Sequence, residues 1–241
     1  MPVSLLPGRT EALPGDTRTL VVAVPDQAIG TVAERLAASG ASLPRIALHL
    51  SGALDASALE TLRARGAAVG SCHPLQTFPD AEVPPDAFEG ITFGLEGDAP
   101  AVAAGRALAS VLGARSVAVP AGAKALWHLA AVLAGNGTIA LVGAALDAMR
   151  AAGLGDEDAL LALGPLARRS LEGALGVGPA AALTGPVARG DEATLERHRA
   201  AIAAWDPSRL ALYEALVAEQ RRLVARREAA KMPSPGSGTG C

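Results

Sequence analysis

Aromatic residues and cysteines are scarce in this sequence, and each scarcity excludes something. Aromatic residues make up 2% of the 241 residues although half of the chain is hydrophobic, so the core has to be built from Ala, Leu and Val. The only cysteines, Cys72 and Cys241, exclude a disulfide framework and fit a reducing cytoplasm. The net charge of −3, with Lys and Arg scattered along the chain, predicts no nucleic acid partner.

Charge is also missing from one long segment. Residues 125–146 contain no Asp, Glu, Lys or Arg, and a segment of that length could span a bilayer. It consists mainly of small residues and includes His128, Asn136 and Thr138, so we interpret it as a helix buried in protein. Residues 1–18 have no basic region followed by an apolar block, which predicts no signal peptide. We therefore expect a cytoplasmic protein with no membrane partner.

Short apolar runs alternate with helical patterns in the first half of the chain. Strands are expected over 19–25, 45–50, 67–72, 91–97 and 116–120, with helices over 27–39, 57–65 and 100–112. We expect Asp26 to cap the first of these helices. This alternation predicts an α/β fold with a mostly parallel sheet.

The pattern changes after residue 120, because no convincing strand follows. A long helical region is expected over 123–152, interrupted near 135–137, and further helices over 156–163, 165–175, 191–205 and 207–230. We therefore expect an α/β domain over 1–120, an all-helical domain over 121–230 and a disordered tail over 231–241.

Polar residues gather where the first three strands end, at 24–26, 49–52 and 71–76. Ligands of such sheets bind outside the carboxyl ends of the strands. A zinc site that uses Cys72 is disfavoured, because no ligand pair has metal-binding spacing and neighbouring strand residues point to opposite faces. We expect no metal.

Lys124 and His128 lie four residues apart on a predicted helix and so share one face. A lysine that begins an uncharged helix has to reach solvent or a polar cleft. Two readings stay open: Lys124 reaches the surface and His128 is a core residue, or both line a cleft with His49 and His73 for proton transfer or carboxylate binding. Beside a turn further along, Thr184 and Arg189 offer a hydroxyl and a fixed positive charge for an anionic group.

Five segments together resemble a known family: AVPDQAI, HLSG, GSCHPLQTF, KALWHLAAVLAGN and GPAAALTGPVARGD, spread over residues 19–225. They are similar to Rossmann-like proteins that carry a C-terminal domain of unknown function 2520. That family is similar to the 6-phosphogluconate-dehydrogenase-like group, which includes ketopantoate reductase and pyrroline-5-carboxylate reductase. The resemblance implies a domain that binds NADP or NAD, a helical domain that forms a homodimer, and hydride transfer to or from a small carbonyl or imine acid.

The resemblance also implies roles for single residues. Lys124 matches the catalytic lysine of the wider group, and His128 stands where that group has an asparagine. The expected catalytic residues are Lys124, His128 and His73. The expected substrate-binding residues are His49, Gln76, Asn136, Thr184 and Arg189, and the expected cofactor-binding residues are Val24, Pro25, Asp26, Ser51 and Gly52.

The sequence departs from the family at its front. No strand followed by G-x-G-x-x-G, the loop that holds a dinucleotide pyrophosphate, is present. Residues 19–25 correspond to the fourth strand of the fold, so we expect an N-terminally truncated Rossmann-like sheet whose open edge is covered by residues 1–18, by a partner chain or by upstream sequence. The alternative function is a cofactor-less binding or dimerisation module.

Overall fold

The computed structural model describes residues 13–14, 16–40, 42–78, 84 and 86–231. The chain divides into two compact units, residues 1–139 and 140–241. The domain boundary expected from secondary structure, at residue 120, lies earlier than this division. Most of the loop expected over 1–18 and nearly all of the expected tail over 231–241 lie outside the described residues.

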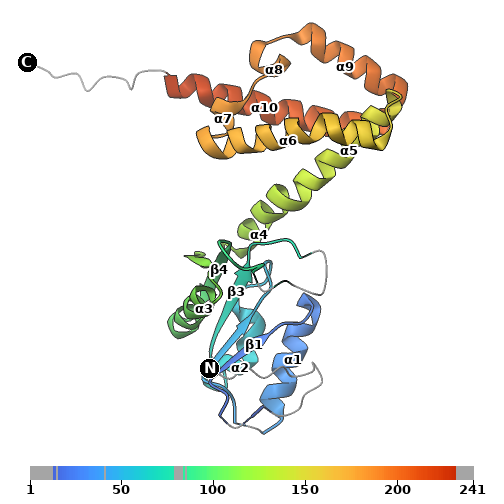
Figure 1. The fold of residues 1–241 in the computed structure, drawn as a ribbon. Coiled ribbons are helices and arrows are strands. Elements are labelled where there is room, and N and C mark those ends of the chain that lie inside the picture. Colours follow the sequence, from blue (N-terminus) through green and yellow to red (C-terminus); the bar gives the residue numbers. More distant parts are fainter. Residues whose placement is uncertain (1–12, 15, 41, 79–83, 85, 232–241) are drawn as a thin grey trace, which may run out of the picture. The chain divides into compact units, whose positions relative to one another are not determined.

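The first unit contains a five-stranded sheet with the strands in chain order (Figure 1). They are β1 (Thr19–Val22), β2 (Ile46–His49), β3 (Ala68–Pro74), β4 (Thr92–Gly97) and β5 (Arg115–Ala118). Three of the four strand pairs are parallel, and only β3 and β4 run antiparallel. The predicted α/β fold with a mostly parallel sheet, followed by a helical region, is therefore confirmed. No described helix lies between β3 and β4, and a crossover helix is what a parallel pair would need.

Helices cover both faces of this sheet. On one face, α1 (Asp26–Ala38), η1 (Ala56–Leu59) and α2 (Glu60–Arg63) enclose a core that includes Ile29, Leu59 and Val69. On the other, α3 (Ala99–Val111) packs against Phe93 and Leu95. Because alternate strand residues point to opposite faces, β2 and β3 contribute to both cores: Ala47 and Val69 to the first, and Leu48 and Cys72 to the second.

The long helical region consists of α4 (Lys124–Val132), a π-helical turn η2 (Leu133–Gly137) and α5 (Thr138–Ala151). The interruption expected near 135–137 is thus a π-helical turn. The prediction that this segment is buried is wrong: Leu126, Leu133 and Ile139 are 70%, 64% and 66% exposed. The α4 face that carries Lys124 packs on the sheet, whereas Leu126 lies on an exposed face of this helix. Within the described residues, Lys124–Ala151 is the one helix long and apolar enough to cross a membrane by length and composition alone.

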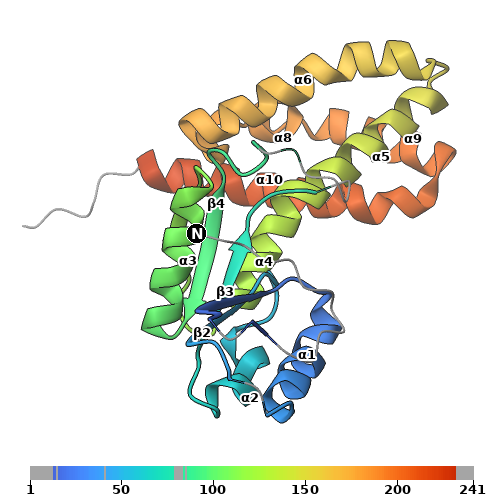
Figure 2. The same ribbon diagram turned by 60° about the horizontal axis from the view of Figure 1, so that its bottom comes forward.

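The second unit is helical (Figure 2). It contains the end of α5, α6 (Asp156–Val177), α7 (Pro179–Ala182), α8 (Pro186–Arg189), α9 (Glu192–Trp205), η3 (Pro207–Arg209) and α10 (Leu210–Lys231). Val187, Leu195 and Val217 form its buried cluster. The expected break near residue 164 is wrong, because α6 continues through Pro165; a proline ring removes one helical hydrogen bond, and the remaining turns of α6 hold the helix together.

Candidate functional site

Polar side chains line one face of the sheet in the first unit. His49, Ser71 and Glu96 are neighbours across β2, β3 and β4. Since alternate residues of a strand share a face, His73 lies on the same side as Ser71. Cys72 points the other way, into the core beneath α3. Three strands thus present polar groups to the first turns of α4.

Lys124 is the centre of this polar face. Its ammonium donates to Ser71 Oγ at 2.8 Å and to the carbonyl oxygen of Ser51 at 3.1 Å, and the residue is 2% exposed. The Ser71 hydroxyl in turn donates to the same carbonyl at 3.0 Å. Among the described residues no carboxylate lies within ion-pair distance of Lys124. The charge is therefore held by neutral oxygens alone.

Burial lowers the pKa of Lys124 from its ordinary 10.5 to about 8, and the strongest opposing influence is the charge of Glu96. Removing an ammonium from water disfavours its charged form. A lysine with a pKa close to neutrality can both donate and accept a proton at physiological pH.

Ser51 holds the surrounding elements together. Its hydroxyl donates to Asp26 Oδ2 at 2.8 Å and accepts the backbone N–H groups of Ala53 and Leu54 at 3.2 and 3.0 Å. Its own N–H donates to His49 Nδ1 at 3.2 Å. Asp26 was expected to cap α1, and this is wrong: Asp26 is the first residue of α1, makes no side-chain cap bond and accepts from Ser51 instead. The Ser51 side chain therefore shapes the loop after β2.

His49 is fully buried and uses both ring nitrogens inside the protein. Nδ1 accepts from Ser51, and Nε2 donates to the carbonyl oxygen of Asp55 at 2.9 Å. Burial is the main cause that lowers its pKa. The ring ties β2 to η1, and nothing in its surroundings supports the predicted contact with substrate.

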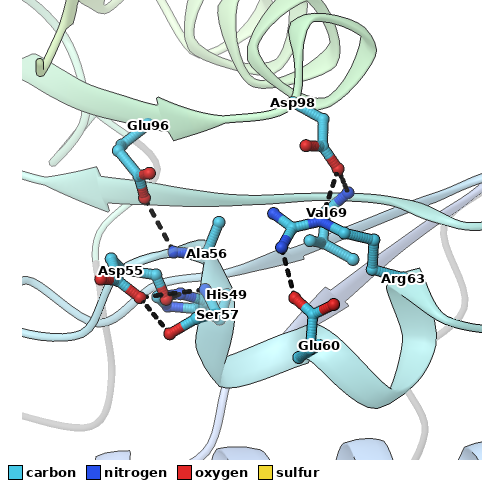
Figure 3. Close-up of polar contacts among 9 residues, drawn as sticks. All are labelled: His49, Asp55, Ala56, Ser57, Glu60, Arg63, Val69, Glu96 and Asp98. Atoms are coloured by element: carbon cyan, nitrogen blue, oxygen red, sulfur yellow. Dashed lines mark hydrogen bonds and ion pairs between the residues drawn. The ribbon is translucent and has the colours of Figure 1, made fainter. Parts of the chain in front are cut away.

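Two carboxylates at the end of β4 fix η1 and α2 on this face (Figure 3). Glu96 Oε2 accepts the N–H of Ala56 at 2.8 Å. Asp98 Oδ2 accepts from Val69 N at 2.9 Å and from Arg63 Nε at 3.1 Å. These bonds anchor η1 and α2 to β3 and β4. Because the loop that contains Ser51 leads into η1, they also hold Ser51 in place.

His73 and His128 meet beside Gly52. Their ring centroids are 5.8 Å apart with the planes at 78°. A Cβ atom on Gly52 would lie 2.7 Å from His73 Nε2 and 2.5 Å from His128 Nδ1, so no larger residue fits there. His128 Nδ1 is buried and has no hydrogen-bond partner among the described residues. Both residues are partly buried.

His73 is held neutral. Burial, with the charges of Lys124 and His128, lowers its pKa to about 4, against a weaker opposing influence of Asp26. Trp127 Nε1 donates to His73 Nδ1 at 3.2 Å. At neutral pH the ring can therefore form hydrogen bonds but carries no charge.

The remaining predicted site residues are exposed or partly exposed. Gln76 is exposed, and its Oε1 accepts the N–H of Thr77. Asn136 is exposed in η2, and Thr184 and Arg189 are exposed in the second unit. Val24 is half-buried and Pro25 exposed before α1. The structure does not decide their predicted roles, which stay predictions.

Three residues of this site were not predicted: Ser71, Glu96 and Trp127. Ser71 stands two positions before His73 in one strand, and Trp127 stands three positions after Lys124 in one helix, so both periodicities carried a signal. Glu96 could be placed only once β4 was known to pair with β3.

The described residues contain no group of three or more His, Cys, Asp or Glu side chains that could hold a metal ion. Burial raises the pKa of the Cys72 thiol to about 11. A thiol with so high a pKa is protonated at neutral pH and is a poor nucleophile or metal ligand.

Comparisons with known proteins agree with the resemblance predicted from the sequence. Residues 91–220, more than half of the chain, match the family described as "Domain of unknown function (DUF2520)". No curated protein matches the chain.

Solved structures share the fold. A protein of Thermotoga maritima is 26% identical with a TM-score of 0.71, over 86% of this chain and 78% of that one. A Bacteroides fragilis protein, provisionally assigned as an NADP oxidoreductase, is 23% identical with a TM-score of 0.69, over 88% and 77%. Plasmodium falciparum pyrroline carboxylate reductase, solved with NADP bound, is 11% identical with a TM-score of 0.55, over 86% and 77%. The chain thus has the Rossmann-like fold found in such oxidoreductases.

Replacing the buried lysine tests whether its charge is held at a cost. The fall in pKa from 10.5 to about 8 corresponds to about 3 kcal/mol in favour of the neutral amine. We therefore expect Lys124→Met to raise the free energy of unfolding at pH 7 by about 1–3 kcal/mol. The folded protein loses the lysine proton at a lower pH than the unfolded chain. Wild type should therefore gain stability relative to Lys124→Met as pH rises from about 8 to about 10.5.

Urea unfolding at several pH values measures both effects. Lys231→Met is the matched control, because Lys231 is the only other lysine and is exposed on α10; it should change stability by less than about 0.5 kcal/mol at every pH. A loss of stability in Lys124→Met of more than about 1 kcal/mol at pH 7 would show that the hydrogen bonds of Lys124 outweigh the cost of its burial.

Proposed function

Because the chain belongs to the family described as Domain of unknown function (DUF2520), we propose that it is an NAD(P)-dependent oxidoreductase acting on a small carbonyl or imine acid. The observation that carries this proposal is Lys124: a buried ammonium with a pKa of about 8 and two neutral oxygen partners. Strongly shifted pKa values in a polar recess are typical of catalytic groups.

The residues beside Gly52 fit one half of the cofactor. His128 Nδ1, which has no hydrogen-bond partner among the described residues and lies beside Gly52, offers a hydrogen-bonding nitrogen to a polar ring such as nicotinamide. Val24, Pro25, Asp26, Ser51 and Gly52 would hold this half; Ser51 would do so by shaping the loop, since its hydroxyl is already bonded. For the pyrophosphate half, the sequence contains no strand followed by G-x-G-x-x-G, and we assign no residues to it.

When bound, the reduced nicotinamide supplies the hydride. Lys124 holds the proton that the product needs. An ammonium has three N–H groups, and two of them bond to Ser71 and Ser51. The third has no partner among the described residues and is free to donate to a substrate oxygen or nitrogen. The remaining two bonds keep the amine in place while its charge changes.

The acid group of the substrate needs a cationic or donor partner. From the resemblance we propose that Arg189 and Thr184 bind an acid group, because they combine a fixed charge with a hydroxyl, and that Gln76 and Asn136 provide further polar contacts. His73 and His128 are proposed to touch the reacting end of the substrate. His128 shares one face of α4 with Lys124, and His73 lies on the side of β3 that carries Ser71, a hydrogen-bond partner of Lys124.

One observation favours a different function. Leu126, Leu129 and Leu133 are exposed, which is a feature expected of a binding or dimerisation module without catalysis. In that case the site formed by Gly52, His73 and His128 holds a small ligand or none.

A homodimer is proposed for either function. Leu126, Leu129 and Leu133 are 70%, 49% and 64% exposed and lie three and four residues apart, on one side of α4 and η2. We call this row the leucine face of α4. Contiguous exposed apolar surface of this kind is typical of protein interfaces, and a second copy of the chain is always available to cover it.

NADPH binding separates the two functions. We expect saturable binding by wild type at micromolar to millimolar cofactor, followed by fluorescence or calorimetry. Gly52→Ala should abolish it, because the added Cβ would lie 2.5 Å from His128 Nδ1. Gly30→Ala in α1 is the matched control, because its Cβ would meet nothing within 4 Å, and it should bind as wild type does. Failure of wild type to bind at millimolar NADPH would favour the module without catalysis.

Replacing part of the leucine face tests the homodimer. Light scattering should give wild type twice the mass of the 24.1 kDa chain, and Leu126→Glu/Leu133→Glu should give a monomer because buried carboxylates are costly. Val111→Glu, at an 84% exposed position on α3, should leave the dimer intact. A wild-type monomer at micromolar concentration would contradict the proposal, and a dimer in the double variant would exclude this face as the interface.

A further inference from the structure

Trp127 makes a contact for which two strands leave room. Its indole N–H donates to His73 Nδ1 at 3.2 Å. Gly94 pairs with His73 across β3 and β4, and a Cβ atom there would lie 2.5 Å from the indole carbon Cε2. The indole therefore occupies a place that any side chain at position 94 would fill. This hydrogen bond therefore depends on two residues: Trp127 donates it, and Gly94 leaves the space for the indole.

The bond decides which ring nitrogen of His73 carries the proton. A neutral imidazole has one N–H and one acceptor nitrogen. Because Nδ1 accepts from Trp127, the proton of the neutral ring is on Nε2. That nitrogen faces Gly52, 2.7 Å from the position of a Cβ atom there. His73 thus directs an N–H donor toward Gly52.

His128 has no such constraint. Its Nδ1 faces Gly52 from the α4 side and has no hydrogen-bond partner among the described residues. Either tautomer is therefore open to it, and it can accept from a ligand or donate to one. The two rings lie beside Gly52 and differ in one property. The proton of His73 is fixed on Nε2, whereas the proton of His128 can occupy either ring nitrogen.

We propose that Trp127 is a positioning residue that fixes His73 as a permanent hydrogen-bond donor, and that proton exchange at this wall belongs to His128. The proposal divides the roles that the sequence gave to both histidines together. It rests on the proposed function only for the identity of the ligand. A fixed donor binds a carbonyl oxygen, whereas the N–H of a protonated imine would face the N–H of His73. Between the two substrate classes of the proposed function, the site therefore fits the carbonyl acid.

The charged groups around His73 act consistently with a fixed, neutral ring. A positive charge on Lys124 or His128 of α4 disfavours a second proton on His73, whereas Asp26 of α1 acts weakly in the opposite sense. Burial of the ring adds to the effect of the cations.

Nitrogen NMR of the histidine side chains tests the proposal directly, since ¹⁵N shifts distinguish the two tautomers and the charged ring. The full chain has four histidines, and single His→Gln variants assign them. In wild type we expect His73 to be a single Nε2–H tautomer that does not titrate between about pH 5 and about pH 9. In Trp127→Phe, which keeps an aromatic ring but removes the donor, His73 should become a mixture of two tautomers and take up a proton at higher pH.

His49 is the internal reference. Its Nδ1 accepts from Ser51 and its Nε2 donates to Asp55, so it should remain the Nε2–H tautomer in every folded variant. Trp205→Phe is the matched control, because Trp205 is the only other tryptophan and lies in the second unit; it should leave His73 unchanged.

Two results would overturn the proposal: a wild-type His73 that carries its proton on Nδ1 or exchanges between tautomers, and a Trp127→Phe variant in which His49 and His73 both keep their wild-type signals. If Trp127→Phe fails to fold, which the His49 signal reports, the wild-type tautomer alone decides. These measurements need no cofactor, substrate or turnover. Failure to bind NADPH would leave them intact, and their failure would leave NADPH binding intact.

Discussion

A buried ammonium without a carboxylate partner is the constraint on which this structure depends. Lys124 is held by one hydroxyl and one backbone carbonyl, and both must be placed by other residues. The Ser51 carbonyl can accept from Lys124 and Ser71 at once because the loop after β2 turns there. That turn is stabilised by Asp26 on one side and by His49 on the other. The loop after β2 therefore has a geometry that stabilises the positive charge of Lys124 away from water.

Two glycines explain why aromatic and imidazole rings can gather so closely above a sheet. Gly94 leaves the space into which Trp127 packs, and Gly52 leaves the space into which the rings of His73 and His128 pack. Each ring then acts on the next through a hydrogen bond or an edge contact. The sheet supplies the fixed positions, and α4 supplies Lys124, Trp127 and His128 from one helical face. The chemistry of the site follows from that face and from strand residues two positions apart.

Much of this arrangement could be predicted from the sequence because it depends on local patterns. The apolar runs placed all five strands, and the resemblance identified Lys124 and the loops at the strand ends. The direction of β4 was not accessible, because it depends on how the chain returns to the sheet. The cap expected from Asp26 was misjudged for a related reason: its side chain accepts instead from Ser51, 25 positions away. The exposure of the leucine face was missed because apolar composition alone does not say whether a helix is covered by its own chain or by another.

Direct titration of Lys124 tests the central claim, which is that burial among neutral oxygens lowers the pKa of this amine to a value close to neutral pH. The chain has two lysines, so carbon-13 labelling at the lysine ε position gives two signals, and Lys231→Met assigns them. The account predicts that the Lys124 signal titrates at about 8, well below the value of about 10.4 for a lysine in a model peptide. A Lys124 signal that titrates near the model-peptide value of about 10.4 would contradict it, because the ammonium would then experience no cost of burial and the site would have no group prepared to give up a proton.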